Sequence, residues 1–85
     1  MTSQIIKQLI ESGLPGADIK VESEDGIHFR AFIVSELFSD KNMLQQHRMV
    51  HESLGDKIGK DIHALSLKTL TPKEYKKITN VKYFL

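Results

Sequence analysis

The chain of 85 residues contains no cysteine and no tryptophan. Without cysteine it forms no disulfide, no thiol nucleophile, no CxxC redox pair and no cysteine-based zinc site. Because iron-sulfur clusters are held mainly by thiolates, any such cluster would need sulfur ligands from another molecule. The sequence also lacks the long apolar run and the small-residue cleavage site of a signal peptide. We therefore expect a soluble cytoplasmic protein that has no membrane partner.

An excess of charge of either sign is also missing, because 12 Lys and Arg residues face 11 Asp and Glu residues, for a formal net charge of +1. So small an imbalance does not by itself indicate nucleic acid or an anionic membrane as a partner. The length is near the lower limit for a hydrophobic core that is stable without disulfides or bound metals. We predict a single domain over residues 1–85.

Local patterns predict three strands and the helices that cover them. The first predicted helix begins after a Thr2 or Ser3 cap and stops at Gly13, and strands 19–22 and 28–34 follow, joined by an Asp25-Gly26 turn. A second helix is predicted over 41–54, capped by Ser39 or Asp40, with one short helical turn over 56–58. A strand over 62–70 and a helix from Thr71 complete the prediction. The third strand pairs either parallel or antiparallel, and a helical crossover favours the parallel alternative. This order predicts an α+β two-layer sandwich with a three-stranded sheet and the helices on one face.

The last helix has the clearest start signal in the chain. Thr71, Pro72 and Glu74 place a hydroxyl at the N-cap, proline at the first position and a carboxylate at the third. The spacing then predicts that Tyr75 and Ile78 point inward.

Two of the four histidines lie in the predicted helix 41–54, where Met43, His47, Val50 and Leu54 share one apolar stripe. His47 and His51 are four residues apart and could chelate one ion from a single helix turn. The simpler interpretation is favoured: His47 is a hydrogen-bonded group at or near the core, and His51 points to solvent.

The other two histidines stand at the entrances of predicted strands. His63 is in phase with Leu65 and Leu67, and His28 follows the Asp25-Gly26 turn. The two imidazoles could converge on a shared ion, although structural or solvated histidines are more common. Spacing alone leaves both alternatives open.

Enzyme motifs are incomplete. The segment 55–61 resembles a phosphate loop but is one residue short and carries Asp61 where a magnesium-binding Ser or Thr is required. His51 and Glu52 match the start of the His-Glu-x-x-His motif of zinc proteases, but Gly55 occupies the position of the second histidine. We expect a protein that is not an enzyme.

A helix-turn-helix-like segment over 41–60 suggests a DNA-binding alternative, in which Arg48, Lys57 and Lys60 would face phosphates. Acidic residues are interleaved with these cations, and the net charge is close to zero. We therefore expect at most weak DNA binding and rank this alternative second.

Several motifs together resemble the BolA family of small stress-response proteins. They are Ile33-Val34-Ser35-x-x-Phe38, Gln46-His47-Arg48-x-Val50, Ile62-His63-Ala64-Leu65 and Thr71-Pro72-x-Glu74-Tyr75. The likeness runs from the first helix to about Tyr75, nearly the whole chain. Because the long insertion between the first strands is missing, the chain resembles the short acid-response (IbaG-like) bacterial subgroup. The resemblance implies a fold similar to class II KH domains.

The resemblance also implies a partner and a cofactor. BolA-like proteins bind monothiol glutaredoxins and can share a bridging 2Fe-2S cluster with them, in iron-sulfur trafficking and iron homeostasis. The family's ligand histidine corresponds to His63. The partner's cysteine and a glutathione would supply the thiolates, so the isolated chain is expected to carry no cluster. An imidazole in place of a thiolate tends to raise the cluster's potential, as in Rieske centres.

The remaining roles that the resemblance implies are less specific. A second cluster ligand comes from the loop between the first two strands, near Asp25, where His28 is the nearest imidazole. His47 and Arg48 match a family signature and are expected to support partner or glutathione docking. Some family members are described as transcriptional regulators, and a homodimer of the chain remains open.

Overall fold

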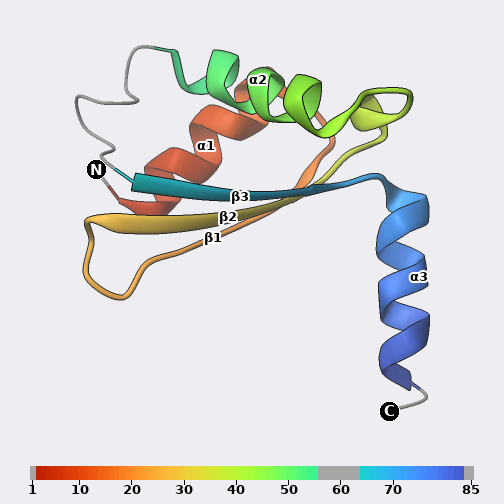
Figure 1. The fold of residues 1–85 in the computed structure, drawn as a ribbon. Helices are drawn as coiled ribbons and strands as arrows, with labels where there is room; N and C mark the ends of the chain where they lie inside the picture. Colours follow the sequence, from red (N-terminus) through yellow and green to blue (C-terminus); the bar gives the residue numbers. More distant parts are fainter. Residues whose placement is uncertain (1, 56–63, 84–85) are drawn as a thin grey trace.

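A computed structural model of the chain describes residues 2–55 and 64–83. Its elements are α1 (Ser3–Gly13), β1 (Asp18–Glu22), β2 (His28–Val34), the 3-10 turn η1 (Glu36–Phe38), α2 (Met43–Leu54), β3 (Ala64–Leu70) and α3 (Pro72–Tyr83) (Figure 1). The described part of the chain is thus an α+β structure with a three-stranded sheet, as the sequence predicts. The turn predicted at 56–58 lies outside the described residues, and η1 is an element that the sequence patterns do not predict.

The sheet has the order β1-β2-β3 and is mixed. β1 and β2 form an antiparallel hairpin in which Lys20 faces Phe32, whereas β3 runs parallel to β2 and places Lys68 opposite the same Phe32. The parallel pairing confirms what the helical crossover favours. Gly26 has a φ of 75°, a left-handed conformation that glycine adopts without strain in the hairpin turn.

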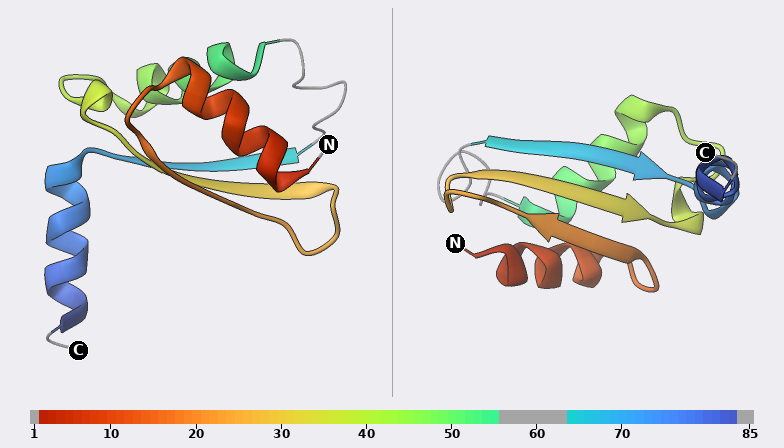
Figure 2. Two further views of the ribbon diagram at one scale, coloured as in Figure 1. Left: turned by 180° about the vertical axis from the view of Figure 1, so that it is seen from behind. Right: turned by 90° about the horizontal axis from the view of Figure 1, so that it is seen from below.

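The two faces of the sheet have different environments. Both α1 and α2 lie over one face, and α3 leaves the end of β3 toward the other side (Figures 1 and 2). Alternate strand residues such as Phe29, Ala31 and Ile33 point to the α1–α2 side and are buried. The core cluster consists of Ile6, Ile10, Leu14, Phe29, Ala31, Ile33, Phe38, Val50 and Leu54.

Helices α1 and α2 approach each other closely where Gly13 meets Ser53. A Cβ atom added at Gly13 would overlap the Ser53 Cβ and lie 3.0 Å from the Ser53 Cα. Gly13 therefore allows a close contact between these helices, in addition to the helix-ending role that the sequence suggests.

The start of α2 differs from the prediction. Asn42 is the N-cap and forms a capping box with Gln45, so the predicted caps Ser39 and Asp40 are wrong. Asp40 has a φ of 64°, outside the helical region, and the chain turns there before the helix begins. Three adjacent polar residues all suit a cap, and the turn decides which one is used.

The buried stripe of α2 is also different from the predicted one. Gln46, Val50 and Leu54 are buried, whereas Met43 is 63% exposed and His47 is half-buried. The prediction that Met43 shares the buried stripe is therefore wrong. Met43 is the first residue of α2, where the helix has not yet reached the core. The core side of α2 includes the polar Gln46, which apolar periodicity does not detect.

Gln46 connects three parts of the fold. Its Nε2 donates to the carbonyl of Lys41 at 2.8 Å, and its Oε1 accepts from the Thr69 hydroxyl at 2.6 Å. Both side chains are buried, at 8% exposure for Gln46 and 6% for Thr69. The amide therefore joins α2, the preceding turn and β3 through satisfied polar contacts.

Helix α3 starts as predicted but packs differently. The Thr71 N–H donates to the Glu74 carboxylate at 2.9 Å, and the Glu74 N–H donates to the Thr71 hydroxyl at 3.2 Å, which is a capping box. The prediction that Tyr75 and Ile78 point inward is wrong, because they are 44% and 41% exposed. The Tyr75 ring meets Phe32 edge-on, with centroids 6.0 Å apart, as α3 extends beyond the sheet (Figure 1).

Candidate functional site

The hairpin turn between β1 and β2 holds Asp25 in a fixed orientation. Its Oδ1 accepts backbone N–H groups from Ile27 at 2.9 Å and from His28 at 2.8 Å. The Ser23 hydroxyl accepts the N–H of Gly26 at 2.9 Å in the same turn. Aspartate forms such turns readily, because its short carboxylate reaches the amides two and three residues ahead.

The second carboxylate oxygen of Asp25 contacts the His28 imidazole. The His28 Nδ1 lies 2.7 Å from the Asp25 Oδ2, and the two side chains are 72% and 48% exposed. The pKa of Asp25 is held well below its usual range, first by the His28 backbone N–H, then by the His28 side chain and the Ile27 N–H. The carboxylate is therefore ionised at neutral pH and acts only as an acceptor.

The Asp25–His28 pair lies at one end of the sheet. In the parallel register His28 faces Ala64, the first residue of β3. The structure thus brings together the two candidate ligands that the sequence places in this loop. His63, which precedes Ala64 in the sequence, lies outside the described residues.

The other predicted site residues are on α2 or outside the described part of the chain. His47 is half-buried, and Arg48 and His51 are exposed on the same helix. They belong to the helical layer, whereas the Asp25–His28 pair belongs to the hairpin. Lys57 and Lys60, which the DNA-binding alternative needs, lie outside the described residues.

Within residues 2–55 and 64–83, no group of three or more His, Cys, Asp or Glu side chains has an arrangement that would hold a metal ion. Asp25 and His28 are a pair and not a complete metal site.

Over the same residues, no helix has both the length and the apolar character needed to cross a membrane.

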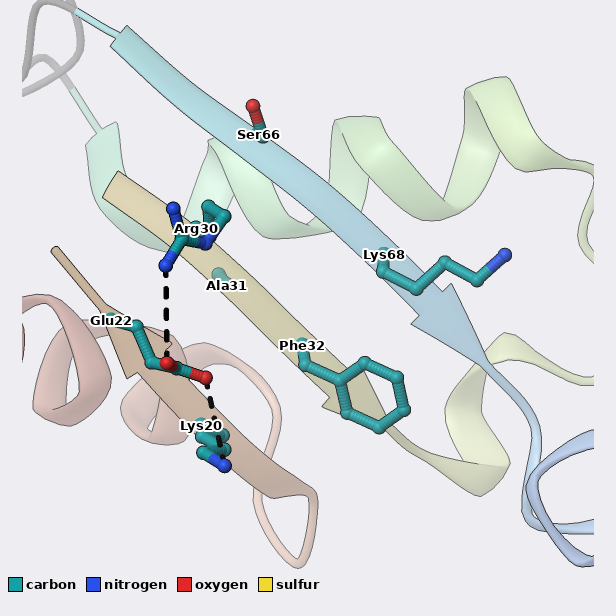
Figure 3. Close-up of a pocket in the computed structure, with 7 residues that line it drawn as sticks. All are labelled: Lys20, Glu22, Arg30, Ala31, Phe32, Ser66 and Lys68. Atoms are coloured by element: carbon teal, nitrogen blue, oxygen red, sulfur yellow. Dashed lines mark ion pairs between the residues drawn. The ribbon is translucent and has the colours of Figure 1, made fainter. Parts of the chain in front are cut away.

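The sheet face opposite α1 and α2 carries a shallow pocket of about 260 Å³, shown in Figure 3. Its lining residues are Lys20, Glu22, Arg30, Ala31, Phe32, Ser66 and Lys68. The Glu22 carboxylate lies 3.5 Å from the Lys20 Nζ and 3.9 Å from an Arg30 nitrogen (Figure 3). The sequence patterns do not single out this surface. Its cations are exposed, and a binding site would need polar groups fixed more firmly.

Comparison with known proteins gives a consistent family match. A model of the family described as "BolA-like protein" matches residues 9–74. BolA-like protein 1 of Mus musculus is 33% identical over 76 residues, which are 89% of this chain and 53% of the mouse protein. The chain thus spans about half the length of that relative. A protein of Haemophilus influenzae named "DNA-binding transcriptional regulator BolA" is 30% identical over 82 residues, covering 86% of this chain and 80% of the relative.

Solved structures share the fold. A bolA protein homologue from Coxiella burnetii superposes with a TM-score of 0.80 at 44% sequence identity, covering 89% of this chain and 97% of that one. The BolA domain of SufE1 from Arabidopsis thaliana superposes with a TM-score of 0.74 at 29% identity, covering 85% and 93%. These likenesses support the same three-stranded α+β architecture.

Proposed function

The chain belongs to the BolA-like protein family, and from this membership we propose that it is a non-enzymatic adaptor that binds a monothiol glutaredoxin. In the complex it would donate imidazole ligands to a bridging 2Fe-2S cluster. Such a cluster supplies a transferable or iron-sensing group, which fits a role in iron-sulfur trafficking, iron homeostasis and stress response. The family match over residues 9–74 is the observation that carries this proposal.

The donor set of the described residues fits this role. His28 offers an exposed imidazole whose Nδ1 is already hydrogen-bonded to Asp25. Histidine ligands to metals usually give their second ring N–H to a carboxylate or a carbonyl in this way. Because the chain has no cysteine, the thiolates would come from the glutaredoxin and glutathione.

We assign His63 as the main ligand and His28 as the second. The support for this pairing is that His28 faces Ala64 in the sheet, and His63 directly precedes Ala64 in the sequence. His47 and Arg48 would help to dock the partner, with the exposed Arg48 fork pairing a carboxylate of glutathione or of the glutaredoxin.

The test is reconstitution of the pair with iron and sulfide under anaerobic conditions. We expect a visible absorption and circular dichroism spectrum with the wild-type chain, and loss or alteration of that spectrum with His63→Ala and with His28→Ala. His51→Ala is the matched control, because His51 is exposed on α2 and is outside the proposed ligand set. Unchanged spectra for both ligand variants would refute the assignment.

We also place the chain in the short acid-response bacterial subgroup. The β1–β2 hairpin supports this, since β1 ends at Glu22 and β2 begins at His28, which leaves no room for a long insertion. The Coxiella burnetii homologue, at 44% identity, is a bacterial relative.

DNA-binding regulation is the second candidate, favoured by the name of the Haemophilus influenzae relative. It would use the exposed Arg48 together with Lys57 and Lys60. Binding to duplex DNA should then weaken steeply with salt, and the slope should fall for Lys57→Ala and Lys60→Ala, because each phosphate contact releases counterions. Absent or salt-independent binding would remove this candidate.

A further inference from the structure

The contact between Asp25 and His28 determines which ring nitrogen carries the proton. The Asp25 carboxylate is ionised and has no proton to donate, so the Nδ1 of His28 must donate across the 2.7 Å contact. A neutral imidazole has a single N–H, and its other nitrogen keeps a free lone pair. When Nδ1 holds the proton, the nitrogen able to bind a metal is Nε2.

The carboxylate is oriented by the backbone and not by the imidazole. Its Oδ1 accepts from the N–H groups of Ile27 and His28, which leaves Oδ2 aimed at the ring. Both oxygens of Asp25 are therefore engaged in hydrogen bonds. This arrangement suits a group that orients a ligand better than a group that is itself a ligand.

We propose that Asp25 is a positioning residue: its carboxylate holds the neutral His28 ring as the Nδ1–H tautomer and so presents Nε2 as the metal-binding atom. This inference rests on the proposed function and deepens it, because it replaces the direct ligand role that the family resemblance implies near Asp25. It also explains why one loop carries both side chains three residues apart.

Asp25→Asn is the most discriminating variant. The single amide oxygen of asparagine can keep the bonds to Ile27 and His28 N–H, which preserves the turn. Its NH₂ group then takes the place of Oδ2 and can only donate, so the His28 ring must accept at Nδ1. The ring is thereby driven to the Nε2–H tautomer, which blocks the nitrogen that would bind the metal.

The tautomer is read on the isolated chain by long-range ¹H–¹⁵N correlation of the histidine rings, at a basic pH at which the ring signals no longer change with pH. We expect His28 to be Nδ1–H in the wild type and Nε2–H in Asp25→Asn. Glu24→Gln is the control, because it removes the same charge one residue away and should leave the tautomer unchanged. An Nε2–H ring in the wild-type chain overturns the inference, whether or not the variant folds.

A second readout uses the chain reconstituted with glutaredoxin, glutathione, iron and sulfide. Asp25→Asn should lower the retention of the cluster against a chelator by about 10- to 100-fold, the usual effect of removing a group that orients a ligand. Glu24→Gln should retain the cluster as the wild type does. Equal retention by Asp25→Asn and the wild type overturns the positioning role.

The two failures can be told apart. If the positioning role is wrong, the wild-type chain holds a cluster while its His28 tautomer is Nε2–H or is indifferent to Asp25→Asn. If the proposed function is wrong, the tautomer is Nδ1–H and changes as expected, but the wild-type chain assembles no cluster with glutaredoxin.

Discussion

The Gln46 amide is a polar side chain in a position that an apolar residue would usually fill. It is 8% exposed, and it satisfies its hydrogen bonds through the Lys41 carbonyl and the Thr69 hydroxyl. A buried amide is costly when one of its partners is removed, because the remaining group loses water without gaining a bond. This residue therefore holds α2 in register with β3.

We predict that Thr69→Val lowers the free energy of unfolding by about 1–3 kcal/mol, because the Gln46 Oε1 would lose its donor while side-chain volume is kept. Thr69→Ser keeps the hydroxyl and should cost about 0.8 kcal/mol through the lost methyl group. Urea unfolding followed by far-ultraviolet circular dichroism measures both. A valine variant as stable as the wild type would contradict this role of Gln46.

At the same scale, the Asp25–His28 contact shows what the sequence could and could not provide. Both residues are predicted candidates, His28 because it enters the second strand just after the Asp-Gly turn, and Asp25 because the family resemblance implies a ligand near it. Their mutual hydrogen bond depends on how the carboxylate folds back onto its own turn. An aspartate three residues before a histidine, across such a turn, is the pattern that could have suggested it.

The helices α1 and α2 pack at a distance that Gly13 allows. Alanine has a better intrinsic helix propensity than glycine, by about 1 kcal/mol. Gly13→Ala would therefore stabilise the fold if the added methyl group met no other atoms. Here the added Cβ would overlap the Ser53 Cβ. The steric cost, which is typically about 1–3 kcal/mol for overpacking, opposes and should exceed that gain.

We predict that Gly13→Ala destabilises the fold and that Ser53→Gly partly rescues it. A double-mutant cycle by chemical denaturation measures the coupling between the two sites, which should favour the double variant. If the two single-variant changes in the free energy of unfolding simply add, Gly13 and Ser53 are not coupled, and the helices can move apart without cost.

Helix α3 depends on its capping box, and this dependence should vary with pH. The pKa of Glu74 is lowered, chiefly by the backbone N–H of Thr71 and then by the Thr71 side chain. A carboxylate with a lowered pKa stabilises the folded form above its ordinary value of about 4.3, and that contribution is lost as the pH falls through the folded value.

We therefore predict that the helical Cα chemical shifts of residues 72–78 weaken in the wild type as the pH falls from about 6 to 3. Glu74→Gln retains a capping side chain but does not titrate, so its shifts should stay level. Glu74→Ala should show weak helical shifts over the whole range. A wild-type profile as level as that of the glutamine variant would show that the carboxylate does not stabilise α3.

The elements differ in how well the sequence predicts them. The bounds of β2 follow from the Asp25-Gly26 turn and the aromatic and β-branched residues after it, and the start of α3 follows from the Thr71, Pro72 and Glu74 signal. All of these signals are local. The exposure of Tyr75 and Ile78 could not be predicted, because periodicity identifies an apolar face but not what it packs against. The position of α3 beyond the sheet is a tertiary property.

Across the whole molecule, the core lies between the sheet and the α1–α2 layer. Every residue of the core cluster comes from α1, the segments next to it, β2, η1 or α2, and none of the described side chains of α3, those of residues 72–78, belongs to it. The described side chains of α3 reach the sheet through Tyr75 and its edge contact with Phe32. Folding of the body should therefore depend little on α3.

We predict that a chain ending at Thr71 still folds and unfolds cooperatively. Its free energy of unfolding should fall by about 1–3 kcal/mol, from the lost aromatic contact and partial burial. Thermal and urea unfolding of the shortened chain measure this, and Phe32→Leu in the full chain separates the aromatic contact from the rest of the helix. Loss of the cooperative transition would place α3 in the core.

In the proposed complex, this cysteine-free chain provides nitrogen ligands to a cluster whose thiolates belong to its partner. The most direct measurement is pulsed electron paramagnetic resonance of the reduced cluster, with ¹⁵N-histidine in this chain and an unlabelled glutaredoxin. We predict strongly coupled nitrogen signals that change from ¹⁴N to ¹⁵N on labelling and that decrease with His28→Ala. A cluster without coupled nitrogen, or with nitrogen signals that ignore the label, would contradict the account.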